Sequence, residues 1–214
     1  MRTVALIDYG SGNLPSAEKA LWAAARCLDT TFEIRATADP DFVARADRLV
    51  LPGVGAFRAC MSALTAREGL VEAMTEAVRA RGAAFLGVCV GMQLLADRGL
   101  EFGETPGLGW IGGEIRRLEP ATHEAKVPHM GWNTIHPLRD HPLLRGMAEG
   151  EHMYFTHSYA FHPTRAEDCA ADVDHGGRFC AVVARDNVAG VQFHPEKSQA
   201  AGLALIQRFL EWTP

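Results

Sequence analysis

Residues 83–93 read AAFLGVCVGMQ, and this stretch decides the fold. Its first six residues carry no charge and are mostly apolar, which is typical of a buried strand, and a helical pattern follows at 92–97. Between the two, Gly87, Cys89 and Gly91 form a G-x-nucleophile-x-G elbow. A nucleophile in such an elbow occupies a sharp, strained turn, and bulky residues at either glycine position would clash with it. The stretch therefore predicts an α/β fold with Cys89 as a nucleophile.

The rest of the first half supports this fold class. Short apolar runs alternate with helical patterns, as expected of βαβ units around a mostly parallel sheet. We expect strands at 4–7, 32–34 and 49–51, and helices at 16–28 and 69–81.

The second half changes in character from residue 107 onward, where Gly and Pro interrupt short β-type runs. We expect antiparallel strands at 110–118, 153–161, 179–184 and 188–193, and a closing helix at 200–212. No internal repeat or clear linker is visible. The prediction is one domain over residues 1–214, flavodoxin-like, with a mostly parallel central sheet, flanking helices and an added antiparallel portion.

The composition narrows the possible functions. The net charge is −5 without any basic block, so nucleic-acid binding is not expected. The apolar runs are too short to span a membrane, so no membrane association is expected either. The five cysteines are odd in number and contain no C-x-x-C pair, and the amino terminus reads as a strand rather than a signal peptide. These features predict a cytoplasmic protein without a disulfide framework.

The setting of Cys89 separates it from the other four cysteines, which lack a glycine frame and read as small buried hydrophobes. Cys89 precedes a helix, where partial positive charge favours the thiolate. The backbone N–H of Val90 is placed to bind a developing oxyanion.

A base for this thiol is predicted in the stretch GVQFHPE at 190–196. Histidine is the usual proton shuttle near neutral pH. In an extended segment, residues two apart project to the same side, so His194 and Glu196 would both face the nucleophile. Glu196 would then orient the imidazole, as the third member of a triad does. No metal-ligand spacing accompanies these residues, and no metal is expected.

A second oxyanion donor is expected from the glycine-rich turn that follows the strand at 49–51. Gly53, Val54 and Gly55 stand there, and glycines let backbone N–H groups approach a ligand closely. A plain strand-to-helix connection is the alternative. The glycine-rich start at 8–13 is not a dinucleotide site, because Pro15 replaces the third glycine of that fingerprint. No cofactor is predicted.

These motifs, in this order, resemble the class I glutamine amidotransferases, and among them the glutaminase subunits of imidazole glycerol phosphate synthase. The resemblance spans almost the whole chain. The elbow and His-Pro-Glu mark the superfamily. The Asp-Tyr-Gly start at 8–10, the Gly-Trp-Asn segment at 131–133 and the Lys-Ser-Gln extension at 197–199 narrow the resemblance to the subunit. The stretches that carry the resemblance are 8–13, 52–57, 87–93, 128–133, 154–159 and 193–199.

The resemblance implies a glutaminase in which Cys89 attacks the carboxamide of glutamine, forming a γ-glutamyl thioester and releasing ammonia. It implies that Gln93 lies near the substrate and that the segment His157, Ser158 and Tyr159 binds its amino-acid end. The ammonia would pass to a (β/α)8 barrel cyclase partner in a heterodimer, for the synthesis of imidazole glycerol phosphate and an aminoimidazole carboxamide ribotide in histidine biosynthesis. The residues that resemble partner-facing positions are Asn13, Met130, Trp132 and Lys197.

Two other enzymatic readings stay open from the sequence. One is a triad glutaminase of another biosynthetic pathway, and the other is a stand-alone γ-glutamyl hydrolase or peptidase-like relative. A binding module with a decayed site is a third reading. The complete set of Cys89, His194 and Glu196 argues against decay.

Overall fold

The computed structural model describes residues 1–122, 124–148 and 150–214. Within these residues thirteen strands form one sheet, whose main path runs β2-β1-β3-β4-β13-β12-β10-β7-β5-β6, and β11, β8 and β9 continue it from β12. The strands are β1 (Arg2–Ile7), β2 (Phe32–Thr37), β3 (Arg48–Gly53), β4 (Ala84–Cys89), β5 (Arg98–Gly99), β6 (Thr105–Pro106), β7 (Gly113–Arg117), β8 (His129–Pro137), β9 (His152–His157), β10 (Tyr159–Pro163), β11 (Cys169–Asp174), β12 (Arg178–Arg185) and β13 (Val188–Val191). The helices are α1 (Leu14–Ala25), α2 (Pro40–Arg45), α3 (Phe57–Thr65), α4 (Leu70–Thr75), α5 (Val90–Gln93) and α6 (Gln199–Glu211).

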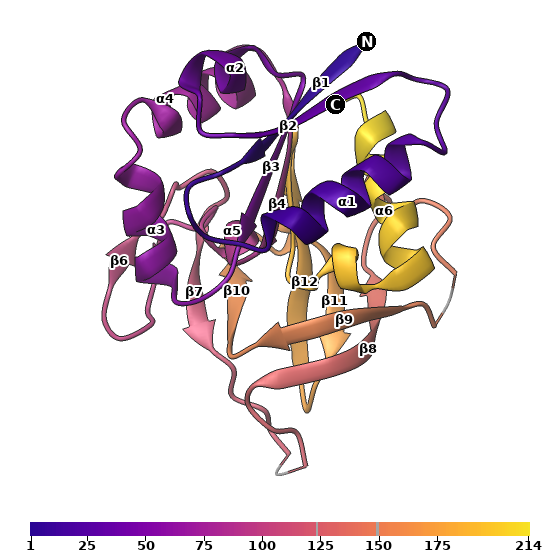
Figure 1. Cartoon of the computed structure of the whole chain (residues 1–214). Helices are drawn as coiled ribbons and strands as arrows, with labels where there is room; N and C mark the ends of the chain where they lie inside the picture. Colours follow the sequence, from indigo (N-terminus) through magenta and orange to yellow (C-terminus); the bar gives the residue numbers. More distant parts are fainter. Residues whose placement is uncertain (123, 149) are drawn as a thin grey trace.

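The first part of the sheet is parallel and covered on both faces. Strands β2, β1, β3, β4 and β13 pair in parallel in that order. Helices α1 and α6 lie on one side of these strands, and α2, α3 and α4 lie on the other (Figure 1). Because both faces are covered, β1, β3, β4 and β13 are buried at successive positions, whereas β2 at the edge alternates.

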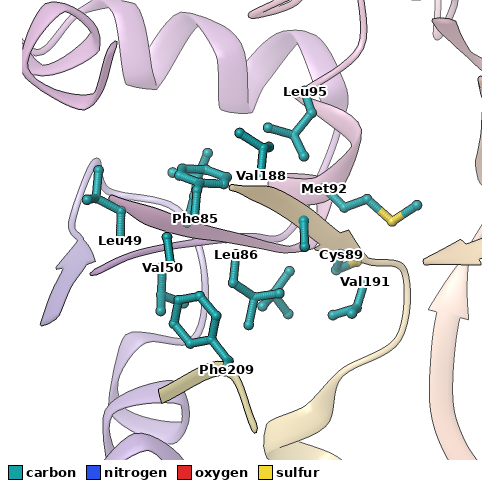
Figure 2. Close-up of a cluster of buried hydrophobic side chains, with 14 of the residues drawn as sticks. Leu49, Val50, Phe85, Leu86, Cys89, Met92, Leu95, Val188, Val191 and Phe209 are labelled. Carbon is teal, nitrogen blue, oxygen red and sulfur yellow. The ribbon is translucent and has the colours of Figure 1, made fainter. Parts of the chain in front are cut away.

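Strand β4 shows what this burial does. Each of its six residues is buried. Phe85 and Leu86 point to opposite sides of the strand. Phe85 lies on the side of Val188, and Leu86 lies on the side of Val50 and Phe209 (Figure 2). The strand is thus anchored by apolar packing on both faces up to Cys89, which ends it.

The second part of the sheet is antiparallel apart from the parallel pair β5–β7, as the second half of the sequence predicts. Strand β12 pairs antiparallel with β13, and β11 connects β12 to β8, which in turn pairs with β9. Strand β9 contacts α6, and β8 lies beyond β9 at the edge of the molecule (Figure 1). The predicted fold class is therefore confirmed.

Three predicted elements need correction. The strand expected at 153–161 is two strands, β9 and β10, that are separated at Ser158. The helix expected at 92–97 is the four-residue α5, which starts earlier because Val90 already has helical geometry directly after the elbow. The helix expected at 69–81 begins at Leu70 and changes into a π-helical turn at Glu76–Ala80.

Other elements were missed from the sequence. They are α2, α3, β5, β6, β8 and β11. In α2 the start signal is complete, since the Asp39 side chain accepts a hydrogen bond from the Asp41 N–H and Pro40 follows the cap. The helix is only six residues long, too short for a clear apolar period. No helix in the described part of the chain has both the length and the apolarity to cross a membrane.

Candidate active site

Cys89 sits in a strained turn at the end of β4. Its backbone has φ 55° and ψ −114°, a conformation that non-glycine residues rarely adopt. A Cβ at Gly91 would lie 1.8 Å from the Leu51 carbonyl oxygen, and one at Gly87 would lie 2.4 Å from the Gly91 carbonyl oxygen. The elbow is therefore packed backbone against backbone, which is the steric reason for both glycines. Such strain clusters at functional sites.

His194 and Glu196 meet at a turn rather than along a strand. The strand β13 ends at Val191, and Pro195–Lys197 form a 3₁₀ turn directly after His194. His194 Nδ1 lies 2.8 Å from a Glu196 carboxylate oxygen, and both side chains are almost fully buried. The expectation that the two side chains share a side is met, but the extended geometry behind it was wrong, because Pro195 starts a turn.

Backbone and hydroxyl contacts fix the position of this imidazole. Ser198 donates its hydroxyl to the His194 carbonyl at 2.6 Å and accepts the Tyr154 N–H at 3.0 Å. The His194 N–H in turn bonds to the Tyr154 carbonyl at 2.9 Å. The ring nitrogen Nε2 is buried and has no hydrogen-bond partner among the described residues. Nε2 is therefore the ring nitrogen that is available to exchange a proton with Cys89.

The protonation of His194 follows from its surroundings. Burial lowers the pKa of this imidazole, but its interactions with the Cys89 sulfur and the Glu196 carboxylate outweigh burial and raise the pKa to about 9. At neutral pH His194 is therefore an imidazolium.

The glycine-rich turn lies directly beside the elbow. Gly53 ends β3 and is in register with Cys89 of β4. A Cβ at Gly53 would come within 2.7 Å of the Gly91 nitrogen, so this position too requires glycine. Val54 and Gly55 line the same pocket as Cys89 and Val90. The four residues expected to supply oxyanion donors are therefore brought together.

Two hydroxyl groups that the sequence analysis missed hold this turn. Tyr9 donates its phenol to the Pro52 carbonyl at 2.8 Å, and Ser11 donates its hydroxyl to the Val54 carbonyl at 2.9 Å. Both belong to the glycine-rich segment at 8–13. That segment thus supports the turn beside the nucleophile, a role which its sequence alone does not indicate.

A pocket of about 370 Å³ opens onto the nucleophile. Every residue that the sequence analysis placed near the substrate lines it: Gln93, His157, Ser158 and Tyr159. Glu101 also lines it and was missed, because it lies in the short connection between β5 and β6, where no pattern marks it. Its carboxylate accepts the Phe57 N–H at 2.7 Å, which fixes it at the pocket wall.

Most of the residues expected to face a partner form an exposed surface beside this pocket. Met130 is 64% and Trp132 47% exposed, although both are large and apolar. Trp132 packs edge-on against Tyr154, and the ammonium group of Lys197 lies over the Tyr154 ring. Asn13 is exposed, and its side chain also caps α1 by accepting the Ser16 N–H.

Comparison with known proteins agrees with this geometry. Residues 5–212 match the family model described as glutamine amidotransferase class-I. The chain belongs to the class I glutamine amidotransferases. The family predicted from the sequence is thereby confirmed.

Curated proteins that resemble this chain share one name. The amidotransferase is 60% identical over 214 residues to "Imidazole glycerol phosphate synthase subunit HisH" of Caulobacter vibrioides, and the match covers 100% of both chains. It is 55% identical over 210 residues to the protein of the same name from Ruegeria pomeroyi, covering 98% of this chain and 99% of the relative.

Solved structures share the fold of this amidotransferase at much lower identity. A structure described as a glutamine amidotransferase superposes with a TM-score of 0.70 at 17% identity and covers 97% of both chains. A glutamine amidotransferase from Thermotoga maritima gives a TM-score of 0.59 at 16% identity, covering 98% of this chain and 83% of the other. These two comparisons bear on the fold alone.

Proposed function

We propose that Cys89, His194 and Glu196 form the catalytic triad with which this amidotransferase hydrolyses L-glutamine to glutamate and ammonia. The observation that carries the proposal is the arrangement of His194. Its Nδ1 faces the Glu196 carboxylate at 2.8 Å, while its Nε2 is buried without a partner among the described residues, in the pocket that holds the strained Cys89.

The reaction follows from these positions. The Cys89 thiolate attacks the carboxamide carbon of glutamine, and the carbonyl oxygen gains the negative charge. When the C–N bond breaks, the His194 imidazolium gives its proton to the leaving nitrogen, which departs as ammonia and leaves a γ-glutamyl thioester. His194, now neutral, takes a proton from water as the water attacks the thioester. Glutamate leaves, and the sulfur returns to the thiolate.

The charge on the oxygen needs donors. Val90 begins α5, where backbone N–H groups have no acceptor within the helix, and its N–H is the first proposed donor. The turn of Gly53, Val54 and Gly55 supplies the second from the neighbouring strand. Preorganised donors of this kind contribute about 10²- to 10³-fold to the rate of acyl transfer.

The pocket also suits the amino-acid end of glutamine. Backbone groups of His157, Ser158 and Tyr159 and the Gln93 side chain line it and offer hydrogen bonds. The Glu101 carboxylate contributes an acidic group that matches the α-ammonium group of the substrate.

The glutaminase works as one subunit of a larger enzyme. The relatives carry the name of an imidazole glycerol phosphate synthase subunit, in agreement with the function predicted from the sequence. We assign the whole chain, residues 1–214, to one amidotransferase domain. It docks in the cytoplasm on a (β/α)8 barrel cyclase through the surface of Met130, Trp132 and Lys197, and passes ammonia to it. An exposed apolar patch beside an active-site pocket is what such docking requires.

The test is glutamine hydrolysis by Cys89→Ala in complex with the cyclase and its nucleotide. We expect glutamine-dependent turnover to fall by about 10⁴-fold or more, because no other group can form the thioester. The cyclase should still form product from added ammonium. The exposed Cys27 gives the matched control, since Cys27→Ala should leave both rates unchanged.

Three outcomes would contradict the proposal. Retained glutamine hydrolysis in Cys89→Ala would refute the mechanism. Capture of a synthetase in place of a cyclase from native extract would place the glutaminase in another pathway. Hydrolysis of a γ-glutamyl peptide by the chain alone, faster than that of glutamine with the cyclase, would identify a stand-alone hydrolase.

A further inference from the structure

A line of hydrogen bonds leads from strand β8 to the Cys89 sulfur, and the backbone carbonyl of Tyr159 joins its two halves. It crosses the interior between the two parts of the sheet and includes residues that the mechanism above does not use. Its members, in order, are Asn133, His129, His157, Gln93, Gln192 and Cys89.

One backbone carbonyl sets the direction of the whole line. The Tyr159 oxygen lies 3.1 Å from Gln93 Nε2 and 2.9 Å from His157 Nδ1. A carbonyl oxygen only accepts hydrogen bonds. Gln93 must therefore present its amide nitrogen here, and His157 must carry its proton on Nδ1.

Toward the nucleophile, the orientation of each side-chain amide is fixed by the group before it. The same Gln93 nitrogen lies 3.0 Å from the side-chain oxygen of Gln192. This oxygen accepts a hydrogen bond from the second N–H of the Gln93 amide. The amide nitrogen of Gln192 is then the atom that faces Cys89, and it lies 3.8 Å from Sγ. Gln192 has no exposed surface, so water does not compete for these bonds.

Away from the nucleophile, the histidines are fixed in the same way. With its proton on Nδ1, His157 accepts at Nε2, so His129 Nδ1 is the donor of their 3.0 Å bond. His129 Nε2 then accepts from the Asn133 side-chain nitrogen at 3.2 Å. That nitrogen also donates to the Asp174 carbonyl at 2.8 Å, which anchors this end. Burial lowers the pKa of His129 to about 3 and that of His157 to about 4, so both rings are neutral, as the pattern requires.

We propose that Gln192 donates a hydrogen bond to the Cys89 thiolate, and that His129 is a positioning residue that acts through His157, holding the Tyr159 carbonyl on which the amides of Gln93 and Gln192 are oriented. This inference rests on the proposed function in taking Cys89 as the nucleophile. Helix α5 has only four residues and provides little field of its own, so a buried thiolate needs a donor of this kind. A charge-assisted bond to sulfur supplies it.

Titratable groups lie around Cys89. His194 interacts with the sulfur from the turn after β13, with Glu196 behind it, and Tyr9 lies in the loop after β1 with its phenol on the Pro52 carbonyl. Glu101 and Lys197 line the same pocket. Gln192 does not titrate, so its donor adds a constant preference for the thiolate. Its loss moves the pH at which the sulfur becomes reactive and adds no new titration step.

The experiment measures alkylation of Cys89 by iodoacetamide in the full chain as a function of pH, with the Cys89 peptide followed by mass spectrometry. Gln192→Met removes the donor at nearly constant volume, and we expect the pH midpoint to rise by about one to two units. Gln192→Glu places a carboxylate against the sulfur and should raise it further. The partly exposed Gln207 of α6 gives the matched control, because Gln207→Glu adds the same charge away from the pocket.

His129 is tested by breaking and restoring its donor. His129→Leu removes the N–H that fixes His157, and the midpoint should rise by up to one unit. His129→Asn places an amide N–H near the position of Nδ1 and should restore the wild-type midpoint. Val78→Ala, a core truncation in the π-helical turn, controls for lost stability and should leave the midpoint unchanged.

The histidine protons can be read without any substitution. In ¹⁵N spectra of the wild-type chain, His129 and His157 should both be neutral with the proton on Nδ1. Finding the proton on Nε2 in either ring, or an unshifted midpoint in Gln192→Met, would overturn the inference. Neither result would affect the proposed catalytic triad, which fails if Cys89→Ala still hydrolyses glutamine.

Discussion

The parallel core and the β8–β9 ribbon hold their functional residues by different physical means. Around Cys89 the chain is packed backbone on backbone, with Gly91 against the Leu51 carbonyl and Gly53 against the Gly91 nitrogen. In the ribbon, His129 and His157 are held by hydrogen bonds and ring stacking, and Met130 and Trp132 are left exposed.

The difference shows what each kind of contact can do. Close packing between buried strands holds a strained backbone, because the many contacts around the turn outweigh its cost. Hydrogen-bonded side chains hold direction and protonation, which packing alone does not control. The nucleophile depends on both, since the core shapes its turn and the line of bonds from the ribbon reaches its sulfur.

The largest expected effect tests the packing of the core. Gly91→Ala would place a Cβ 1.8 Å from the Leu51 carbonyl, and β3 must move to relieve the overlap. We expect a loss of more than about 4 kcal/mol in the free energy of unfolding, large enough to prevent folding. Gly131→Ala in β8 meets open space and carries only the strain of its φ of 128°, so it should cost about 1–2 kcal/mol. Urea denaturation measures both, and equal losses would contradict the contrast.

The next effect tests the exposed side of the ribbon. Trp132→Ala should weaken binding of the cyclase by about 2 kcal/mol, or about 30-fold in Kd, because large aromatic side chains dominate protein interfaces. Trp22 on α1 is similarly exposed, at 37% against 47%, and serves as the control. Isothermal titration calorimetry compares the two. An equal change in both variants would mean that Trp132 has no special place in docking.

The smallest effect, counted per pH unit and per histidine, is that of pH on stability, and it has opposite signs in the two regions. His129 and His157 have pKa values of about 3 and 4, below the ordinary 6.5. Their neutral forms stabilise the fold above pH 6.5, and this stability is lost as the pH falls toward 4, by up to about 1.4 kcal/mol per pH unit for each ring. His194, with a pKa of about 9, contributes stability below pH 6.5 that is lost as the pH rises through 9.

Urea denaturation between pH 4 and 10 checks this prediction. Cys89→Ala should flatten the alkaline side alone, because it removes the partner of the imidazolium. His129→Asn should flatten the acid side alone. If either variant changed both sides equally, the assignment of the two slopes to two regions would be wrong.

The parts of the site that could be predicted from the sequence are those whose residues are only a few positions apart in the chain. Gly87 and Gly91 frame Cys89 within five residues, and His194 lies two residues from Glu196. These residues lie close together in the chain, so their spacing alone marks them. The fold class followed similarly from the alternation of short strands with helices.

The parts that could not be predicted depend on contacts between distant residues. Gln93 and Gln192 are 99 positions apart, and Tyr9 reaches Pro52 across 43. A glutamine or a tyrosine in a single sequence does not indicate which distant residue it will bond to. Glu101 was missed for the same reason, since only the folded chain brings it to the pocket wall.

The contact between Gly91 and the Leu51 carbonyl also has a consequence for laboratory evolution of this enzyme. In a library that varies every position, Gly87 and Gly91 would be filtered by abundance, because their variants fail to fold. Cys89 would be filtered by turnover alone, because its variants fold and stay inactive. A selection that scores abundance and turnover separately would therefore distinguish Gly87 and Gly91, which folding requires, from Cys89, which catalysis requires.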